Sequence, residues 1–385
     1  MIPEIQQLAQ AGHDVLIVPR STRGCLVHDR SLCKAARCEA LLSPRVLVTA
    51  MAVTARAPYA VAGAIRSLLA SRSFAILLKN LVVVPKALWL AQVAQQWRAD
   101  HIHCHWAATT ASVGMLASAL SRIPWSFTAH RWDIVENNLL ASKAKKASFV
   151  RFISEDGLHL AHSAGVDADR NLQVMHMGVR VPSPYTRRQT RGTIVVCPAR
   201  LVAVKGHRNL LRAWRILRRQ GLVGELWLAG DGELRGELER LCVRLQIDDS
   251  VKFLGTLPHE ELLALYKEVS ISAVVLPSVD LGNGCHEGIP VALMEAMSYG
   301  IPVVATATGG TGELVEGAGL LVPPENAAAL ADALRGLLLN RNERIRLGYC
   351  GRERVLQHFN IVQITGELVR RFETSRLPSA AGQFA

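Results

Sequence analysis

The chain has 385 residues, a length that predicts two domains rather than a single core. Half of the residues are hydrophobic and a fifth are charged, a globular composition that excludes an intrinsically disordered chain. The net charge is +12, and residues 1–189 carry 22 basic against 11 acidic residues, so an anionic partner is expected on that half. Nucleic acid is disfavoured as that partner, because the sequence has no zinc finger, RNP-type motif or long basic block.

No targeting or membrane-spanning segment is predicted. Residues 1–12 carry Glu4 and three glutamines, which does not fit a signal peptide. The most apolar window, Phe74 to Ala94, is interrupted by two lysines and a proline, and a spanning helix needs about 20 apolar residues. The eight cysteines form no C-x-x-C pair, so a reduced, cytoplasmic chain is expected.

The first half is expected to open with a helix, Pro3–Ala11, which Gly12 ends and the strand Asp14–Val18 follows. A doubly wound domain normally begins instead with a strand and a loop that lead into such a helix. We therefore expect the first sheet to lack its first strand, through a start placed too far downstream or a truncated chain. Four further strands are predicted, at 101–104, 125–128, 149–153 and 172–175.

A Pro- and Arg-rich stretch, Val181–Gly192, is predicted to link the two halves. In the second half, short β-branched runs alternate with helical patterns, which indicates a doubly wound parallel sheet. The predicted strands are Thr193–Pro198, Glu225–Gly230, Val251–Gly255, Ile271–Leu276, Ile301–Ala305 and Leu320–Val322. The predicted helices lie near 206–220, 233–245, 259–268, 289–299 and 326–339, and the tail 341–375 is expected to be helical.

Two glutamates eight positions apart, Glu287 and Glu295, form the most informative motif of the second half. Pro290 between them fits the first turn of a helix, so Gly288 and Ile289 offer backbone N–H groups at a positive helix end. This arrangement suits a diphosphate, with one carboxylate on a sugar and the other on ribose hydroxyls. The alternative is an ordinary acid at a helix start and a second acid on the surface.

Arg200 and Lys205 follow the strand Thr193–Pro198, and ligands of open α/β sheets bind at the carboxyl ends of strands. Two cations there can stabilise the charge that develops on a leaving diphosphate. The alternative is a pair of solvated surface cations.

Glycines follow two more predicted strands and allow a ligand to approach the backbone closely. Gly230 and Gly232 come after the second strand, and Gly309, Gly310 and Thr311 after the fifth. Plain strand-to-helix turns are the alternative for each. Because all these segments are expected at one edge of one sheet, together they favour a binding site.

Histidines stand out in the first half. His130 follows a predicted strand, and a neutral imidazole there can donate to a sugar hydroxyl, although a satisfied core histidine is the alternative. His101, His103 and His105 share one face of an extended chain. No fourth ligand lies nearby in the sequence, so no metal site is predicted, and His105 is expected to border an acceptor.

With these motifs the chain resembles glycosyltransferase family 4 of the GT-B fold, in particular bacterial colanic-acid and exopolysaccharide glycosyltransferases. The likeness runs from about residue 3 to residue 358. It rests on Arg200 and Lys205-Gly206, Gly230-Asp231-Gly232-Glu233, Glu287 and Glu295, Gly309-Gly310 with Glu313, and the segments Ala99–Trp106 and Phe127–Ile134.

The resemblance implies an α/β fold of two Rossmann-like, doubly wound domains that face each other across a cleft. An acceptor domain is expected over residues 1–185, a nucleotide-sugar domain over 190–358, and a tail at 359–385 that crosses back. The resemblance also implies transfer with retention at the anomeric carbon, with no metal and no other cofactor.

The same resemblance assigns individual roles. Arg200 and Lys205 are expected on the diphosphate, Glu295 on the ribose, Glu287 on the transferred sugar and His130 at the cleft near the sugar hydroxyls. Gly230, Gly232, Gly288, Ile289, Gly309, Gly310 and Thr311 complete the expected donor site.

The expected partners are a nucleotide-sugar donor and a lipid-linked or other saccharide acceptor, with the chain peripheral on the inner face of the plasma membrane. The basic, apolar stretch Arg66 to Lys86 is either an interfacial surface or a buried helix pair with extended lysines. Two alternatives to the transferase are a sugar-nucleotide epimerase of the same fold and an inactive, truncated partner in a polysaccharide assembly complex.

Overall fold

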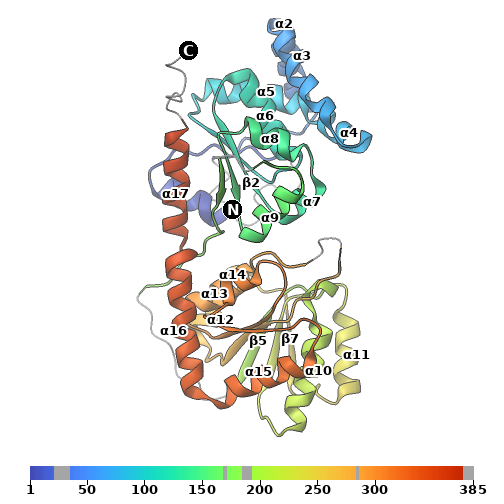
Figure 1. Cartoon of the computed structure of the whole chain (residues 1–385), viewed down its shortest axis with the longest axis vertical. Coiled ribbons are helices and arrows are strands. Elements are labelled where there is room, and N and C mark those ends of the chain that lie inside the picture. The colour runs from blue at the N-terminus through green and yellow to red at the C-terminus, as the bar shows by residue number, and fades with distance from the viewer. Residues whose placement is uncertain (21–34, 168–170, 184–192, 283–285, 376–385) are drawn as a thin grey trace. The chain divides into compact units, whose positions relative to one another are not determined.

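A computed structural model describes residues 1–20, 35–167, 171–183, 193–282 and 286–375 (Figure 1). The chain forms two compact units. Unit 1 comprises Met1–His176 and the segment that begins at Gln363, and unit 2 comprises Met177–Val362. The chain therefore passes between the units twice. The predicted linker lies largely in residues 184–192, outside the described residues.

Unit 2 contains a six-stranded parallel sheet in the order β10-β9-β8-β5-β6-β7. All six strands lie within two residues of their predicted positions, which confirms the doubly wound prediction. They are β5 (Ile194–Pro198), β6 (Glu225–Ala229), β7 (Val251–Gly255), β8 (Ala273–Leu276), β9 (Val303–Thr306) and β10 (Leu320–Val322). The central strands β8 and β9 are buried at every position, as expected of a parallel sheet covered on both faces.

The helices of unit 2 also follow the prediction, apart from one helix start and two short elements, η3 and α14, that were not predicted. The helix predicted from residue 289 begins at Val291, because Pro290 is the extended N-cap residue. The helical elements are η3 (Ala203–Lys205), α10 (His207–Arg219), α11 (Arg235–Leu245), α12 (His259–Glu268), α13 (Val291–Ser298), α14 (Thr311–Val315), α15 (Ala327–Leu339) and α16 (Arg341–His358).

The strand order of unit 2 reverses between β5 and β8. From β5 the chain moves outward to β6 and β7, and from β8 it moves the other way to β9 and β10. The loops that leave β5 and β8 therefore diverge to opposite faces of the sheet and open a crevice between them. Ligands of open α/β sheets bind at such a switch point, outside the carboxyl ends of the strands.

Unit 1 contains a four-stranded parallel sheet in the order β1-β2-β3-β4. Helix α6 packs on one face, where Gly114 lies against Cys104, and α5 packs against α6. Phe372 of α17 lies over the other face beside Phe149. The strands are β1 (Ile102–His105), β2 (Trp125–Ala129), β3 (Phe149–Phe152) and β4 (Leu172–Val174), and α17 spans Ile361–Thr374.

The strand predicted at Asp14–Val18 is wrong. The segment makes only an isolated bridge between Ile17 and Ala36, and Leu16 and Val18 pack against Trp89. Its apolar run is explained by contact with a helix rather than by pairing in the sheet. The preceding helix, α1 (Ile2–Gln10), lies within one residue of its prediction.

The other helices of unit 1 are α2 (Pro44–Arg56), α3 (Pro58–Arg66), η2 (Ser67–Ala70), α4 (Phe74–Val82), α5 (Val84–Gln96), α6 (Thr109–Ser121), α7 (Arg131–Glu136), α8 (Leu140–Lys146) and α9 (Glu155–Ser163). In the described part of the chain no single helix has the length and apolar character of a membrane span. Two bent pairs pass that test jointly, namely α2 with α3–η2 and α4 with α5.

Candidate functional site

The switch point of unit 2 brings Lys205 and Glu287 together. Lys205 ends η3 after β5, Glu287 lies between β8 and α13, and the Lys205 ammonium donates to Oε2 of Glu287. The hydroxyl of Ser278 donates to the same oxygen at 3.1 Å. Both charged side chains are partly exposed, so the ion pair faces the solvent edge of the sheet and can meet a ligand.

A glycine sets the position of this lysine. Gly206 has a φ of +67°, and a Cβ there would lie 1.9 Å from the carbonyl oxygen of Pro277. Only glycine combines that backbone conformation with so close an approach. The end of η3 is thereby held against the loop that follows β8, on which Ser278 lies.

Arg200 is exposed at the end of β5, and among the described residues its side chain has no charged or hydrogen-bonded partner. The loop that follows β6 packs backbone to backbone beside it. A Cβ on Gly230 would lie 2.1 Å from the carbonyl oxygen of Ala199, and one on Gly232 would lie 2.6 Å from that of Leu201. Arg200 therefore carries an uncompensated charge on the edge that carries Lys205.

At the same edge of the sheet, the segment before α13 packs against the loop that follows β9. Gly309 has a φ of +49°, and a Cβ there would lie 1.9 Å from the carbonyl oxygen of Glu287. A Cβ on Gly310 would lie 2.8 Å from the side chain of Ile289. The N–H groups of Gly288 and Ile289 have no acceptor among the described residues, as an anion site before a helix requires.

Thr311 begins α14 behind this loop. Its hydroxyl is buried and has no hydrogen-bond partner among the described residues. Burial without a partner costs free energy, so a ligand group that reached this hydroxyl would be stabilised.

Glu295 has a different partner from Glu287. Its Oε1 lies 2.6 Å from Nε2 of His259, the first residue of α12. Burial raises the pKa of Glu295, and the hydrogen bond from His259 opposes that change. His259 was not singled out from the sequence, although it follows β7 and so shares the edge with the other residues.

His130 follows β2 in unit 1. Its backbone N–H donates to Oδ2 of Asp133 at 3.0 Å, and the Ala107 N–H donates to the same oxygen at 2.7 Å. Burial, with a smaller contribution from nearby Arg151, lowers the pKa of His130 to about 4. The imidazole is therefore neutral at pH 7, and its Nε2 has no hydrogen-bond partner among the described residues.

An aromatic side chain that the sequence analysis did not single out lies beside this histidine. The ring centroid of Trp106 is 5.5 Å from that of His130. Trp106 has a φ of +74°, a strained conformation for a bulky residue, and 44% of it is exposed. Strain of this kind clusters at functional sites.

His105 lies in a buried ionic cluster. Its Nε2 is 3.9 Å from Oε2 of Glu4, and Oε1 of Glu4 accepts a hydrogen bond from Arg151 at 2.6 Å. Burial and the neighbouring positive charges hold the pKa of His105 well below its ordinary value. The side chain is 14% exposed, and contact with an acceptor stays a prediction.

The other two histidines of the alternating run are engaged within the unit. His101 and His103 both contact the hydroxyl of Ser126 at 2.7 Å, and His103 also contacts Thr128. Among the residues that the structure describes, no three His, Cys, Asp or Glu side chains are grouped to hold a metal ion.

The geometry thus gathers the expected donor residues on one edge of unit 2 and places His130 and His105 in unit 1. Lys205 contacts Glu287 directly, and the glycine loops pack around the same segments. The edge residues are Arg200, Lys205, Gly230, Gly232, Glu287, Gly288, Ile289, Glu295, Gly309, Gly310 and Thr311.

Comparison with known proteins agrees with this geometry. Residues 185–354 match the family of glycosyl transferases group 1. A putative colanic acid biosynthesis glycosyltransferase, WcaL, of Escherichia coli is 38% identical over 177 residues, covering 45% of this chain and 43% of that protein. The WcaL of Salmonella typhimurium is 30% identical over 304 residues, covering 74% of this chain and 73% of that protein. The chain thus matches less than half of the Escherichia coli relative.

Solved structures share the fold. A glycosyltransferase from Rickettsia africae superimposes with a TM-score of 0.71 at 17% identity, over 98% of this chain and 94% of that one. Anabaena HepE, solved in complex with UDP, superimposes with a TM-score of 0.62 at 22% identity, over 75% and 82%. The fold of this chain is accordingly GT-B.

Proposed function

The chain belongs to the group 1 glycosyl transferases, and from this premise we propose that it moves a sugar from a nucleotide diphosphate sugar to a saccharide acceptor in bacterial exopolysaccharide biosynthesis. The names of the colanic acid relatives support the pathway. The HepE structures with UDP and with UDP-glucose support a uridine diphosphate donor as the first candidate.

The observation that carries the proposal is the contact of Lys205 with Glu287 at the switch point. Lys205 and Arg200 bind the diphosphate, together with the N–H groups of Gly288 and Ile289. Glu287 holds Lys205 in place and accepts hydrogen bonds from the transferred sugar. Glu287 thus positions both the Lys205 ammonium group and the transferred sugar.

The ribose binds near Glu295. The Glu295 carboxylate accepts hydrogen bonds from the two ribose hydroxyls, and His259 orients that carboxylate from the start of α12. Gly230 and Gly232, with Gly309, Gly310 and Thr311, line the donor with backbone that comes close to it.

The transfer proceeds with retention and without a metal ion. The acceptor hydroxyl attacks the anomeric carbon on the face from which the diphosphate leaves, the bond from that carbon to the phosphate oxygen breaks, and the leaving phosphate takes the acceptor's proton. Arg200, Lys205 and the start of α13 stabilise the charge that develops on the diphosphate. No side chain acts as a nucleophile, and neutral His130 hydrogen-bonds a sugar hydroxyl.

The acceptor is a lipid-linked saccharide, and the chain works at the inner face of the plasma membrane. Support for this location comes from the charge distribution, since residues 1–189 hold 11 of the 12 excess positive charges. A basic surface attracts anionic lipid, with about 1 kcal/mol for each Lys or Arg close to the membrane.

A thermal-shift screen with UDP-, GDP- and ADP-sugars tests the donor. A specific nucleotide at 100 times its Kd stabilises the protein by about 2.7 kcal/mol. Incubation of that donor with lipid extract then tests the reaction, with the anomeric configuration of the product read by NMR and the rate repeated in EDTA. A new product from the donor alone would favour the epimerase, and nucleotide binding without any product would favour the inactive partner.

A further inference from the structure

Helix α4 of unit 1 exposes several large apolar side chains. Phe74, Leu78, Leu81 and Val82 are all exposed, with Phe74 at 79% and Leu78 at 52%, and this spacing puts them on one face. On the other side of the helix the polar residue Asn80 is fully buried, while its neighbour Lys79 is exposed. A helix of a globular protein normally buries its apolar face, so α4 is built to meet an apolar medium on its outer side.

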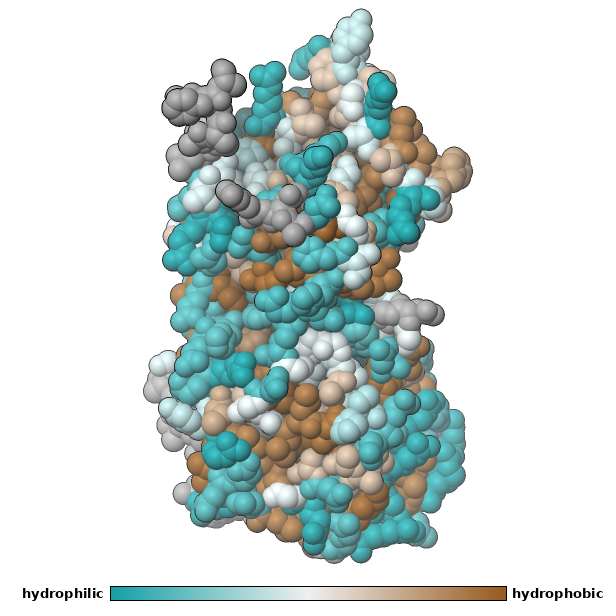
Figure 2. Space-filling view, in the orientation of Figure 1, coloured by the Kyte–Doolittle hydropathy of each residue, from teal (hydrophilic) through white to brown (hydrophobic). Residues whose placement is uncertain are grey.

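The neighbouring elements extend this apolar surface, and Figure 2 shows brown side chains gathered over α3 and α4 at the upper right. Leu69 of η2 is 65% exposed and Tyr59 of α3 is 91% exposed. On α2 the exposed apolar residues are Leu47, Val48 and Met51. We call these residues, with the four of α4, the α2–α4 face.

The charged residues of the segment that forms this face are all basic. Residues 40–99 contain seven Lys and Arg and no Asp or Glu. Arg56, Arg66 and Arg72 are exposed and have no ion-pair partner among the described residues, while Lys79 pairs with Glu136 at 2.8 Å. The sequence analysis included Lys86 in a possible interfacial surface over Arg66 to Lys86. In the structure Lys86 is buried and donates to the carbonyl oxygen of Glu39, so it does not contribute to this face.

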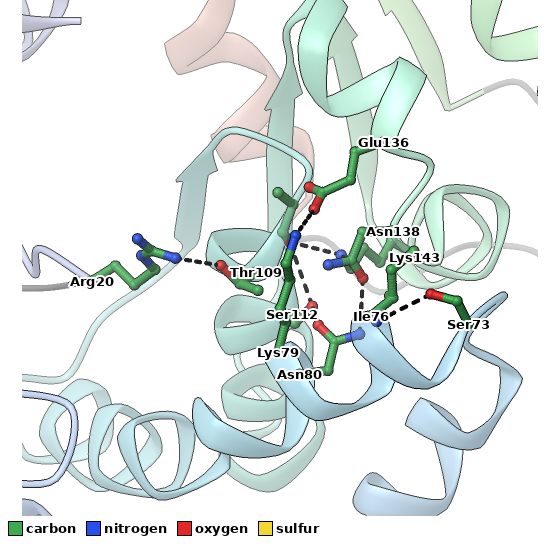
Figure 3. Close-up of polar contacts among 11 residues, drawn as sticks. Arg20, Ser73, Ile76, Lys79, Asn80, Thr109, Ser112, Glu136, Asn138 and Lys143 are labelled. Atoms are coloured by element: carbon green, nitrogen blue, oxygen red, sulfur yellow. Dashed lines mark hydrogen bonds and ion pairs between the residues drawn. The ribbon is translucent and has the colours of Figure 1, made fainter.

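The buried side of α4 is fixed to the carboxyl edge of the unit 1 sheet (Figure 3). Asn80 accepts a hydrogen bond from Ser112 of α6 at 2.7 Å and donates to Asn138 at 2.9 Å. Lys143, also buried, donates to the carbonyl oxygens of Ala107 and Ala108 at 2.7 Å. Lys143 also donates to Oδ1 of Asn138 at 3.4 Å, so the network ties α4 to the loop that follows α7 and, through Lys143, to the loop that follows β1, where Trp106 lies.

We propose that the α2–α4 face docks in the interfacial layer of an anionic bilayer, with the apolar side chains among the acyl chains and Arg56, Arg66 and Arg72 on anionic headgroups. Apolar burial and cationic attraction together characterise interfacial helices, whereas a second copy of the chain would bring like charges together. Docking would hold Trp106 and His130, at the carboxyl ends of β1 and β2, close to a lipid-linked substrate. The inference therefore deepens the proposed function and rests on it for the identity of the acceptor.

Vesicle co-sedimentation tests this proposal on the full chain. Vesicles of phosphatidylcholine with phosphatidylglycerol are expected to bind the protein, and pure phosphatidylcholine far less. The double variant Phe74→Ser/Leu78→Ser is expected to lose about tenfold or more in partition, and Arg66→Gln/Arg72→Gln to lose the preference for anionic vesicles. The matched control is Val223→Ser/Val243→Ser, which removes two exposed apolar side chains of unit 2 and should bind like wild type.

Two readouts keep the outcomes distinct. The thermal shift with the donor nucleotide reports unit 2, and hydrogen exchange of β1, β2 and β3 reports the fold of unit 1. Both should be unchanged in every one of these variants, so that loss of vesicle binding cannot be ascribed to unfolding or to a failed donor assignment. Equal recovery of wild type with neutral and anionic vesicles, or a dimer in sedimentation equilibrium that Phe74→Ser/Leu78→Ser dissociates, would overturn the proposal. Vesicle binding without a nucleotide shift would instead overturn the donor site alone.

Discussion

Lys205 and Glu287 lie 82 positions apart in the chain, yet the ammonium group of the first donates to the carboxylate of the second. The contact spans the point at which the strand order of unit 2 reverses, between β5 and β8. In the proposed function the Lys205 ammonium group would be shared between Glu287 and the bound diphosphate. The proposed chemistry depends on this relationship.

Removal of either partner should nearly abolish turnover. Lys205→Ala deletes a cation that stabilises the leaving diphosphate, and Glu287→Ala deletes both the group that positions this cation and a contact to the sugar. We expect each to lower kcat by about 100-fold or more. Lys252→Ala is the control, because it breaks an exposed ion pair with Glu225 in the same unit and should leave the rate within about twofold. Wild-type rates in both Lys205→Ala and Glu287→Ala would contradict the assignment.

Gly309→Ala should destroy the donor site, whereas Gly312→Ala should not. The added methyl group at Gly309 would collide with the Glu287 carbonyl oxygen and with the ring of His286, which displaces Glu287. Gly312 lies in α14 with nothing within 4 Å of an added Cβ, and there Ala stabilises the helix by about 0.5–1 kcal/mol. The donor-induced thermal shift distinguishes them: it should vanish in Gly309→Ala and persist in Gly312→Ala. An equal shift in both would mean that the nucleotide binds elsewhere.

His130→Ala should impair transfer and leave donor binding intact. His130 lies in unit 1, and its loss removes a hydrogen bond to a sugar hydroxyl, which lowers kcat by about tenfold or more. Trp106→Ala should raise KM for the acceptor, because an exposed indole beside His130 offers an apolar ring face. Steady-state kinetics with the donor thermal shift as control measure both effects. A lost nucleotide-induced thermal shift in either variant would mean that the side chain is needed to bind the nucleotide itself, which would contradict both proposed roles.

Acid should destabilise unit 2 through His207. Burial lowers the pKa of this histidine from 6.5 to about 4, so as pH falls the unfolded chain takes up the proton before the folded one. Stability is therefore lost between about pH 6.5 and pH 4, by about 2 kcal/mol between pH 7 and pH 5. Hydrogen exchange of β5 and β6, corrected for intrinsic rates, measures the loss. His207→Gln should reduce this acid sensitivity, and His358→Gln, at an exposed histidine, should not.

The strands of unit 2 were predictable because each is a short, mainly apolar run that alternates with a longer helical pattern, and β5, β8 and β9 are also rich in valine. The edge that collects Arg200, Gly230, Glu287 and Gly309 followed from the parallel order, since all four positions come after a strand. The sequence did not predict which side chains contact one another at this edge. Nothing local indicates that Glu287 meets Lys205 while Glu295 meets His259, because strand order and loop packing decide those contacts.

Unit 1 was less predictable, for physical reasons that particular residues show. The run Asp14–Val18 has a strand-like pattern, but Leu16 and Val18 find their apolar partner on a helix, and periodicity cannot distinguish the two. Glu4 appears in the sequence as an ordinary acid of a helix start, yet it is buried against Arg151, 147 positions away. The exposed apolar stripe of α4 was indistinguishable from a core stripe until its burial was known.

The proposal that the diphosphate binds where Lys205 meets Glu287 can be tested by hydrogen exchange. The full chain is compared with and without the donor nucleotide that the thermal-shift screen identifies. Bound nucleotide should slow exchange in four separate segments of unit 2, at 199–206, 230–233, 287–295 and 308–311, and Lys205→Ala should reduce this protection. Protection confined to other segments, or unchanged protection in Lys205→Ala, would contradict it.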